Sequence, residues 1–468
     1  MLDLGRCAEA PIAEEFEAAE LGDPRRRRRL VRVAEQAMAA PSVGFPRMVA
    51  DDSELEGIYR LLSNEHIEPE AVLEPHLVAT FNRMRQVEGI VLVAHDTTEL
   101  HFGGRQTRDG LGLMSGNQQG FRAHLALALL PGEDRYPLGC CGLVRVCRTE
   151  RKNSRKKSWY EMSKDPTRES LRWNELLEQV SERAQGVECI HLMDREGDNY
   201  DLLALMLRRK DRFVVRACHD RALAGGARLL RHLSKLKPKG FREIEISERL
   251  PDGKRKAQHP ARSRRLARVA VAGCTVTIMQ SGGAHAAEEQ LKLNVVRVWE
   301  PRPPSGEPAV EWILYTTEPV HESKHLFAVV DHYRARWVIE EFFKALKSGC
   351  SIEKRQLESY HALSMALSMF IPIAWRLLLA RSVARTAPTS SATMVASEVQ
   401  LKLLKHKLKS PGPLQTAEQA TFAIAKLGGH LKRNGPPGWL TLGRGFEALL
   451  MMEVGWQAAM AQRRSDQS

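Results

Sequence analysis

The sequence predicts an α/β core between a helical N-terminal region and a helical C-terminal region. Strand-like apolar runs and helical runs alternate between residues 89 and 218, which is typical of an α/β sheet. Before residue 75 and after residue 380 the apolar periodicity is helical. A chain of 468 residues also exceeds one compact core, so we expect several domains. The expected boundaries are 1–75, 76–380 and 381–468.

The N-terminal region begins its first long helix at residues 23 and 24. Asp23 is a typical N-cap residue and Pro24 suits the first helical position. Five arginines follow, Arg25 to Arg29. Five consecutive residues sweep about 400° around a helix, so they cannot all share one outward face. They are either a solvated charge run or a surface for phosphates. Residues 51–64 predict a second helix.

The central region predicts the order β-β-β-α-β-α-β. The strands are residues 89–100, 121–131, 136–149, 187–194 and 212–218, and the helices are residues 167–184 and 195–210. Three strands in succession indicate an antiparallel start, and the helical connections that follow indicate parallel strands. Residues 222–318 carry four further strand-like runs, which we interpret as a β-rich insertion.

Composition favours a soluble protein with a polyanionic partner. The net charge is +13 and the sequence pI is about 9.4, and nucleic acid is the leading partner of so basic a protein. The eight cysteines form no C-x-x-C pair, which is typical of a reduced cytosolic protein. The N-terminus lacks the apolar segment of a signal peptide. The most apolar stretch, residues 362–380, contains Pro372 and Arg376 and predicts a buried helix rather than a membrane span.

Three acidic residues form a candidate metal site. Asp96 and Asp194 each end the apolar run of a predicted strand, where α/β folds place their ligands. Glu340 lies in residues 331–347, which predict one helix. At about 100° per residue, Glu340 shares a polar stripe about 60° wide with Tyr333, Arg336 and Lys347. Three carboxylates suit Mg²⁺ or Mn²⁺. The alternative is a solvated stripe with i,i+4 ion pairs.

The stripe Y-x2-R-x3-E-x6-K resembles the Y-R-E-K signature of bacterial DDE transposases, which move cut-and-paste insertion sequences and composite transposons. The strand order, with acids on its first and fourth strands, resembles the ribonuclease H-like core of that family. Further segments resemble the family in the same order along the chain: LGDPRR (21–26), DTT (96–98), DREGD (194–198), RFVVR (212–216), residues 300–320 and AIAKLGG (423–429).

The resemblance implies that Asp96, Asp194 and Glu340 bind two Mg²⁺ ions, with Mn²⁺ as a substitute. It implies phosphate contacts for five residues: Tyr333, Arg336, Lys347, Arg195 and Arg216. Trp312 matches a tryptophan that stacks on a base flipped out of the duplex; otherwise it is a core aromatic residue. The N-terminal region would recognise DNA through Arg25, Arg26 and Arg29, with Tyr59 and Arg60 as further candidates. Arg27 and Arg28 depart from the family pattern.

The activity that this resemblance implies is cutting and joining of double-stranded DNA at transposon ends and target sites. Cleavage would free a 3′-OH, which forms a hairpin with the opposite strand before transfer to target DNA. The partners implied are the DNA and a second copy of the chain, paired through the C-terminal region in a synaptic complex. The expected location is the bacterial cytoplasm, at the nucleoid, with no membrane.

Two other functions are open from the sequence. A protein of this fold could be a catalytically silent DNA-binding inhibitor or a domesticated regulator, although the intact acids argue against it. His321-Glu322-x-x-His325 matches the zinc motif of metallopeptidases, in which both histidines lie on one helical face. That match is short, and it begins directly after Pro319 and Val320, where a helix would only be starting.

Overall fold

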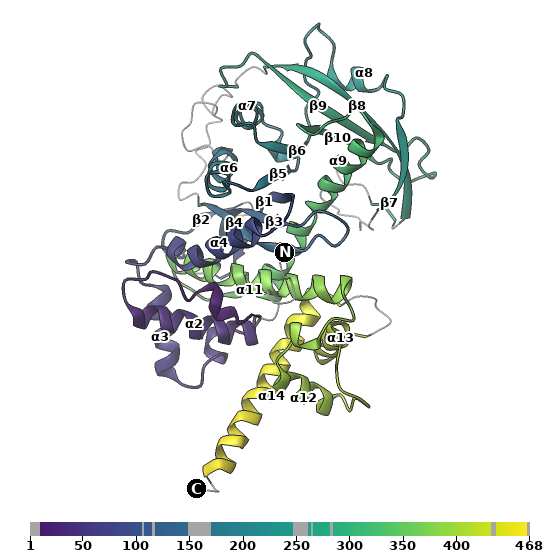
Figure 1. The fold of residues 1–468 in the computed structure, drawn as a ribbon. Helices are drawn as coiled ribbons and strands as arrows, with labels where there is room; N and C mark the ends of the chain where they lie inside the picture. Colours follow the sequence, from purple (N-terminus) through teal and green to yellow (C-terminus); the bar gives the residue numbers. More distant parts are fainter. Residues whose placement is uncertain are drawn as a thin grey trace.

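The described strands form one mixed sheet of ten strands (Figure 1). The computed structural model describes residues 10–104, 107–114, 118–147, 170–246, 261–263, 265–280, 284–431 and 437–465. Nine strands follow the order β2-β3-β1-β5-β6-β10-β9-β8-β7, and β4 pairs with β3. Their bounds are β1 (Ile90–Phe102), β2 (Gly112–Leu113), β3 (Gln119–Leu129), β4 (Pro137–Val146), β5 (Glu188–Met193), β6 (Arg212–Arg216), β7 (Gly240–Ile246), β8 (Arg265–Met279), β9 (Gln290–Trp299) and β10 (Glu311–Thr316).

The described helices lie around this sheet and below it in Figure 1. Their bounds are α2 (Pro24–Ala39), α3 (Asp52–Leu62), α4 (Pro69–Arg85), α6 (Leu171–Arg183), α7 (Tyr200–Arg209), α8 (Leu229–Leu233), α9 (Ser323–Ala335), α10 (Val338–Lys344), α11 (Tyr360–Thr386), α12 (Glu398–Lys407), α13 (Ala417–Leu427) and α14 (Trp439–Ser465). Asp23 caps α2 by accepting a hydrogen bond from the Arg25 amide at 2.7 Å, and Pro24 is its first residue. The predicted start of this helix is therefore confirmed.

The central strand order agrees with the prediction, apart from the two-residue strand β2. β1 pairs with β3, and β3 with β4, in antiparallel fashion. β1 pairs with β5, and β5 with β6, in parallel fashion through the helical connections α6 and α7. This mixed sheet with its helices fits an α/β ribonuclease H-like core.

The β-rich segment of residues 222–318 continues the same sheet. β10 pairs with β6, and β9, β8 and β7 follow outward as antiparallel neighbours. The predicted strand at residues 241–250 is described only as far as Ile246. Residues 254–265 are strongly basic and predict a loop; residues 254–260 and 264 lie outside the described residues.

The apolar run of β1 predicted that the strand ends at Asp96, but the strand continues beyond this residue. The strand continues to Phe102 because β3 pairs with it along its whole length, as far as Phe102–Gln119. Its parallel pairing with β5 does stop before Asp96, at Ala94–Leu192. Asp96 therefore lies in a continuous strand, immediately beyond the point at which β1 and β5 separate.

Helix α11 is a core element, as predicted. Among the described residues it is the one helix long and apolar enough to cross a membrane, and its most apolar window is entirely buried within the protein. It runs between the sheet above it and helices α12, α13 and α14 below it in Figure 1. Pro372 and Arg376 both lie inside it and are buried.

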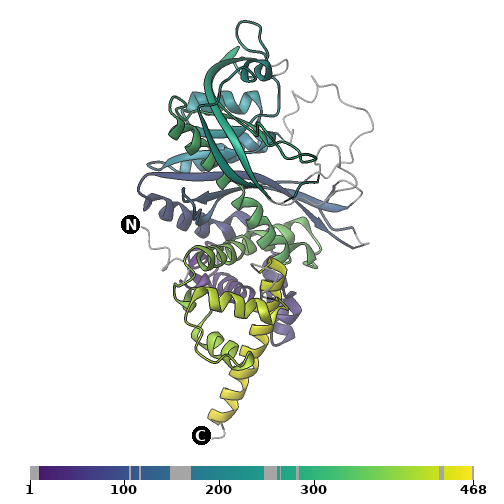
Figure 2. The same ribbon diagram turned by 90° about the vertical axis from the view of Figure 1, so that its right-hand side faces the viewer.

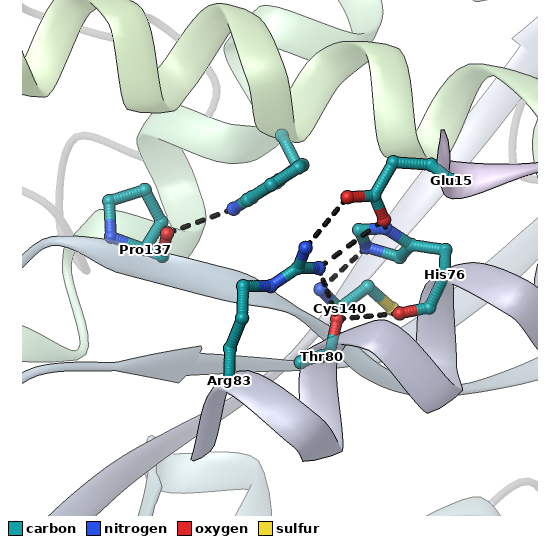
Figure 3. Close-up of polar contacts among 7 residues, drawn as sticks. Glu15, His76, Thr80, Arg83, Pro137 and Cys140 are labelled. Atoms are coloured by element: carbon teal, nitrogen blue, oxygen red, sulfur yellow. Dashed lines mark hydrogen bonds and ion pairs between the residues drawn. The ribbon is translucent and has the colours of Figure 1, made fainter. Parts of the chain in front are cut away.

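The N-terminal segment is attached to the core by a buried ionic cluster (Figure 3). The Glu15 carboxylate lies 2.5 Å from His76 Nδ1 and accepts a hydrogen bond from Arg83 at 2.6 Å. The Cys140 amide donates to His76 Nε2 at 3.0 Å, so this nitrogen carries no proton and His76 is neutral. The Arg83 guanidinium also lies 4.3 Å from the centre of the Trp375 ring. Since both nitrogens of His76 are occupied, the Glu15–His76 pair is an anchor and not a catalytic dyad.

The C-terminal helices pack below α11, and α14 projects away from the rest of the molecule (Figures 1 and 2). Met451 and Trp456 on this helix are exposed. Residue 75 lies within α4 and residue 380 within α11, so no secondary-structure element ends at either expected domain boundary.

Candidate active site

Asp96 and Asp194 come to adjacent positions through the register of β1 and β5. The paired residues Leu92–Ile190 and Ala94–Leu192 differ by 98 in sequence number, and so do Asp96 and Asp194. Side chains two residues apart on a strand point to the same face, so both aspartates follow the face of the buried residues at 92, 94, 190 and 192. The Asp194 carboxylate also accepts a hydrogen bond from the Glu196 amide at 2.9 Å.

Glu340 joins the aspartates through an arginine. The Arg336 guanidinium donates to Asp96 Oδ2 at 2.9 Å and to Glu340 Oε1 at 2.8 Å. Its side chain is only 7% exposed, so both ion pairs are shielded from solvent. Asp194 interacts electrostatically with Asp96, Arg336 and Glu340. One guanidinium thus lies among three carboxylates that come from three separate elements.

Burial and the neighbouring charges shift the pKa values of Asp96 and Glu340. Burial raises the pKa of Asp96 to about 7, because the attraction of Arg336 does not outweigh burial and the nearby charge of Asp194. Burial also raises the pKa of Glu340, again against the effect of Arg336. The pKa of Arg336 is raised: burial alone would lower it, and Asp96 leads the groups that outweigh burial. Burial is thus the main cause of both raised carboxyl pKa values, and the charges of the neighbouring carboxylates add to it.

The segment of residues 331–347 is not the single regular helix that its periodicity predicted. Between α9 and α10 the Arg336 and Glu340 amides donate to carbonyls three residues earlier, at 3.1 and 3.2 Å. This tight winding brings side chains three residues apart into line, and the Arg336 guanidinium lies 6.0 Å from the centre of the Tyr333 ring. A π-helical turn, Ala345–Gly349, follows directly.

Lys347 lies in this π-helical turn and is directed toward a later part of β1. Its ammonium donates to the Glu99 carbonyl and lies 3.6 Å from the Glu353 carboxylate. The wider winding of a π turn changes the position of Lys347 relative to Glu340. Of the predicted stripe, the structure brings Tyr333, Arg336 and Glu340 together, whereas Lys347 has partners of its own.

Further predicted DNA-contact residues surround the acids. Arg216 interacts electrostatically with Tyr333, Arg195 and Arg336. Arg195 is exposed and directly follows Asp194. Trp312 is half-buried, and its ring centre lies 5.8 Å from that of Tyr333. Trp312 is neither fully in the core nor freely exposed.

The predicted contacts in the N-terminal region have different surroundings. Arg25 is exposed, whereas Arg26 donates to the Leu21 carbonyl at 3.1 Å and Arg29 to the Gly57 carbonyl at 3.3 Å. Arg60 is exposed and pairs with Glu56 on its own helix. Tyr59 is half-buried and packs edge-on against Phe45, at 6.3 Å between ring centres.

The zinc motif at residues 321–325 does not form the predicted geometry. α9 begins at Ser323, so His321 lies outside the helix and the two histidines are not one helical turn apart. Lys324 pairs with Glu322 at 2.9 Å. Among the described residues, one group of ligand atoms lies close enough to hold a metal, namely Asp198, Cys218 and His219. The Asp198 carboxylate there already accepts hydrogen bonds from Arg221 and from the amides of residues 218 and 219.

One exposed aromatic residue beside the acids was missed by the sequence analysis. The Trp337 side chain is 48% exposed, and the Arg336 guanidinium lies 6.0 Å from the centre of its ring. A regular helix would place Trp337 off the polar stripe. The only signal in the sequence is its position next to Arg336.

Two protein-family models match the chain. A model described as transposase DNA-binding matches residues 8–67, and a model described as transposase DDE domain matches residues 167–371. The second match contains Asp194 and Glu340, whereas Asp96 precedes it. A solved chain from the cryo-electron microscopy structure of the piggyBac transposase synaptic complex with hairpin DNA is 9% identical, with a TM-score of 0.35 over 88% of this chain and 83% of that chain. That likeness is too distant to support an argument. The two family matches identify the chain as a DDE transposase, a DNA-binding enzyme of DNA transposition.

Proposed function

We propose that this transposase belongs to the bacterial cut-and-paste family with the Y-R-E-K signature and acts on the terminal inverted repeats of its own element. The observation that carries the proposal is the meeting of Asp96, Asp194 and Glu340 around Arg336. In this proposal residues 1–75 recognise the repeat, residues 76–380 cut and join DNA, and residues 381–468 pair two protomers in the synaptic complex.

The donor set fits two Mg²⁺ ions, held by Asp96, Asp194 and Glu340. Carboxylate oxygens are the ligands that Mg²⁺ prefers, and three carboxylates lie around the single guanidinium of Arg336. When bound, the ions supply Lewis-acid activation of the attacking oxygen and neutralise charge on the leaving oxygen.

The proposed reaction is a series of in-line phosphoryl transfers. Hydrolysis frees the 3′-OH of the transposon end, and this hydroxyl attacks the opposite strand to form a hairpin. Hydrolysis of the hairpin and attack on target DNA follow, without a covalent protein intermediate. Around the acids, Arg195, Arg216, Tyr333 and Arg336 hold the phosphates of the end in line for attack.

The proposal is tested with DNA that flanks the gene. We expect terminal inverted repeats there, and a labelled duplex ending in one repeat should be nicked and converted to a hairpin in Mg²⁺ or Mn²⁺. Binding of that duplex without cleavage by the purified wild-type protein, in either metal, would instead support an inhibitor.

Arg336 is expected to hold the acids together only until metal and DNA arrive. Replacing it with glutamine removes a competing cation, so the affinity for Mn²⁺ without DNA should rise by about tenfold, the equivalent of about 1.4 kcal/mol. Affinity for the DNA end should fall, because a phosphate contact is lost. Titration calorimetry and a gel-shift assay measure the two effects. Arg334→Gln is the control, since Arg334 pairs with Asp331 at 3.6 Å. Weaker Mn²⁺ binding in Arg336→Gln would contradict this role.

Trp312→Ala is expected to separate nicking from hairpin formation. Stacking on an extruded base is worth about 1–3 kcal/mol, and only the hairpin step requires the strand to bend sharply. Because Trp312 is half-buried, the loss of stability should be smaller than the roughly 3–5 kcal/mol typical of a core aromatic residue. A gel time course and a thermal melt provide the measurements. The control is Trp299→Ala, a half-buried tryptophan on the neighbouring strand. Equal loss of both steps, with a large fall in melting temperature, would make Trp312 a core residue.

DNA binding by the N-terminal region should depend on salt through its arginines. Replacing Arg25, Arg26 and Arg29 with alanine is expected to reduce the slope of log affinity against log salt by up to about three units. The control variant loses three exposed cations of the β-rich segment instead: Arg231, Lys235 and Lys237. An unchanged slope in the first variant would mean that these arginines are a solvated surface.

A further inference from the structure

Arg172, in the first turn of α6, contacts both of the elements that carry the aspartates. Its Nε donates to Thr97 Oγ1 on β1 at 3.1 Å, and its terminal nitrogen donates to Glu196 after β5 at 2.5 Å. The Arg172 side chain is 9% exposed, whereas that of Glu196 is 60% exposed. Arg172 thus lies mostly inside the protein, and of these two partners Glu196 is near the surface.

Thr97 and Glu196, which both contact Arg172, are also the residues whose amides orient the acids. The Thr97 amide donates to Asp96 Oδ1 at 2.8 Å, and the Glu196 amide donates to Asp194 Oδ1 at 2.9 Å. The contacts therefore form a continuous chain from Asp96 through Thr97, Arg172 and Glu196 to Asp194. Arg172 is the member that joins its two halves.

This link lies where the sheet no longer holds the two strands together. The last described pair between β1 and β5 is Ala94–Leu192, two residues before each aspartate. Beyond that pair, ladder hydrogen bonds do not set the separation of the two chains. The Arg172 side chain spans this gap from the opposite face, since Thr97 and Asp96 point to opposite sides of β1.

A buried polar layer supports Thr97 on the α6 face. The Thr97 hydroxyl lies 2.9 Å from His124 Nδ1, and the His95 and His191 rings are joined at 2.9 Å. All three histidines are buried, and the centre of the Trp173 ring lies 4.2 Å from that of His124. Burial keeps the histidines neutral by lowering the pKa of each one. In this layer Arg172 is a positive charge that donates to the Thr97 hydroxyl and to the Glu196 carboxylate.

We propose that Arg172 is a positioning residue that sets the separation of Asp96 and Asp194 and thereby the affinity of the site for divalent cations. The inference rests on the proposed metal-binding role of the two aspartates. Metal ions require their ligands within a few tenths of an ångström of an ideal position, and loss of a residue that orients metal ligands typically weakens metal binding by about 10–100-fold. Arg172 does not itself contact the reacting phosphate, because it is buried on the other face of β1.

The test is a calorimetric titration of the full-length protein with Mn²⁺ in the absence of DNA. Arg172→Met keeps the length of the side chain but removes both hydrogen bonds, and we expect it to weaken Mn²⁺ binding by at least about tenfold. Arg172→Lys can retain one of the two contacts and should recover part of the affinity. Arg183→Met, at the exposed far end of α6, is the matched control and should bind Mn²⁺ as the wild type does.

Two partner variants separate positioning from general loss of stability. Thr97→Val and Glu196→Met each remove the acceptor of one half of the link, and each should weaken Mn²⁺ binding. Either change should add little in an Arg172→Met background, because the link is already broken. Glu196 is exposed, so its replacement leaves the fold intact and makes the test independent of melting temperature. Additive effects, or full Mn²⁺ affinity in Glu196→Met, would overturn the positioning role.

Two further measurements distinguish the remaining outcomes. Binding of the DNA end without metal should be unchanged in Arg172→Met; a loss there with Mn²⁺ affinity intact would make Arg172 a DNA contact and overturn the inference. Asp96→Ala and Asp194→Ala report on the proposed function itself. If they bind Mn²⁺ as the wild type does, the metal site is wrong and the inference fails with it. If they lose Mn²⁺ and Arg172→Met does not, only the inference fails.

Discussion

Replacing Asp96, Asp194 or Glu340 with alanine is expected to abolish strand cleavage while leaving DNA-end binding largely intact. Each change removes a proposed metal ligand, and the expected loss exceeds the roughly 10²–10³-fold effect of removing a single hydrogen-bond donor from a catalytic site. Recognition of the end lies mainly in the N-terminal region under the proposed function, so affinity should change little. A time course of nicking on a labelled end, run beside a gel-shift assay, measures both.

The matched control for these variants is Glu341→Ala. Glu341 follows Glu340 on α10, but it pairs with Lys344 and Arg381, at 2.7 Å each. Its loss should leave cleavage near the wild-type rate. If any one of the three acid variants cuts DNA at that rate in Mg²⁺, the proposed site is wrong.

Replacing Asp96 with asparagine, which also removes the carboxylate, should not reduce stability. The pKa of Asp96 is raised to about 7 in the folded protein, mainly by burial, so the ionised carboxylate is less favourable in the fold than in the unfolded chain. The loss of folding stability caused by the ionised Asp96 carboxylate is absent below its ordinary pKa of about 4. It is complete above about pH 7. Asp96→Asn should therefore unfold at the same or a higher temperature than the wild type at pH 8. An inactive variant of this kind separates catalysis from folding.

Glu15→Gln is expected to reduce the free energy of unfolding by about 3 kcal/mol at neutral pH, the equivalent of the shift in its pKa. Burial raises the pKa of Glu15, but His76 and Arg83 outweigh burial and lower it to about 2. The variant also leaves the buried Arg83 without a negative partner, which is the costly way to break a buried ion pair. Denaturant unfolding measures the difference.

The pH dependence of this difference follows from the direction of the shift. The folded pKa of Glu15 is lower than the unfolded value, so its stabilisation is complete above the ordinary pKa of 4.5 and is lost as the pH falls toward 2. The difference in the free energy of unfolding between wild type and Glu15→Gln should be constant from pH 8 to about 5. It should fall by roughly half by pH 3. Glu14→Gln is the control, because Glu14 is exposed beside Glu15. A difference in the free energy of unfolding that increases on acidification would contradict a stabilising role of the ionised Glu15 carboxylate.

The elements of the core could be predicted because their signals are local. Apolar runs bounded by turn residues marked β1, β3, β4, β5 and β6, and Asp23 with Pro24 marked the start of α2. Long-range pairing could not be derived in this way. The attachment of β10 to β6, which makes the β-rich segment part of the main sheet, joins strands about a hundred residues apart. Similarly, the sequence shows Glu15 only as one acid in an acidic segment. Its burial and its pairing with His76 and Arg83 are visible only in the structure.

The sequence by itself determined the chemistry of the candidate site. The residue types Asp96, Asp194, Glu340 and Arg336, and their places on strands and on a helix, were all readable from local pattern and from resemblance to a family. Only the tertiary structure decided how they meet. The register of β1 against β5 aligns Asp96 with Asp194, and register depends on pairing between chains far apart in sequence. The tight winding at Arg336 and the π turn at Lys347 depart from 3.6 residues per turn because packing and ion pairs override the intrinsic period of the helix. Arg172 showed no signal in the sequence, since its role depends on two partners that only the fold brings within reach.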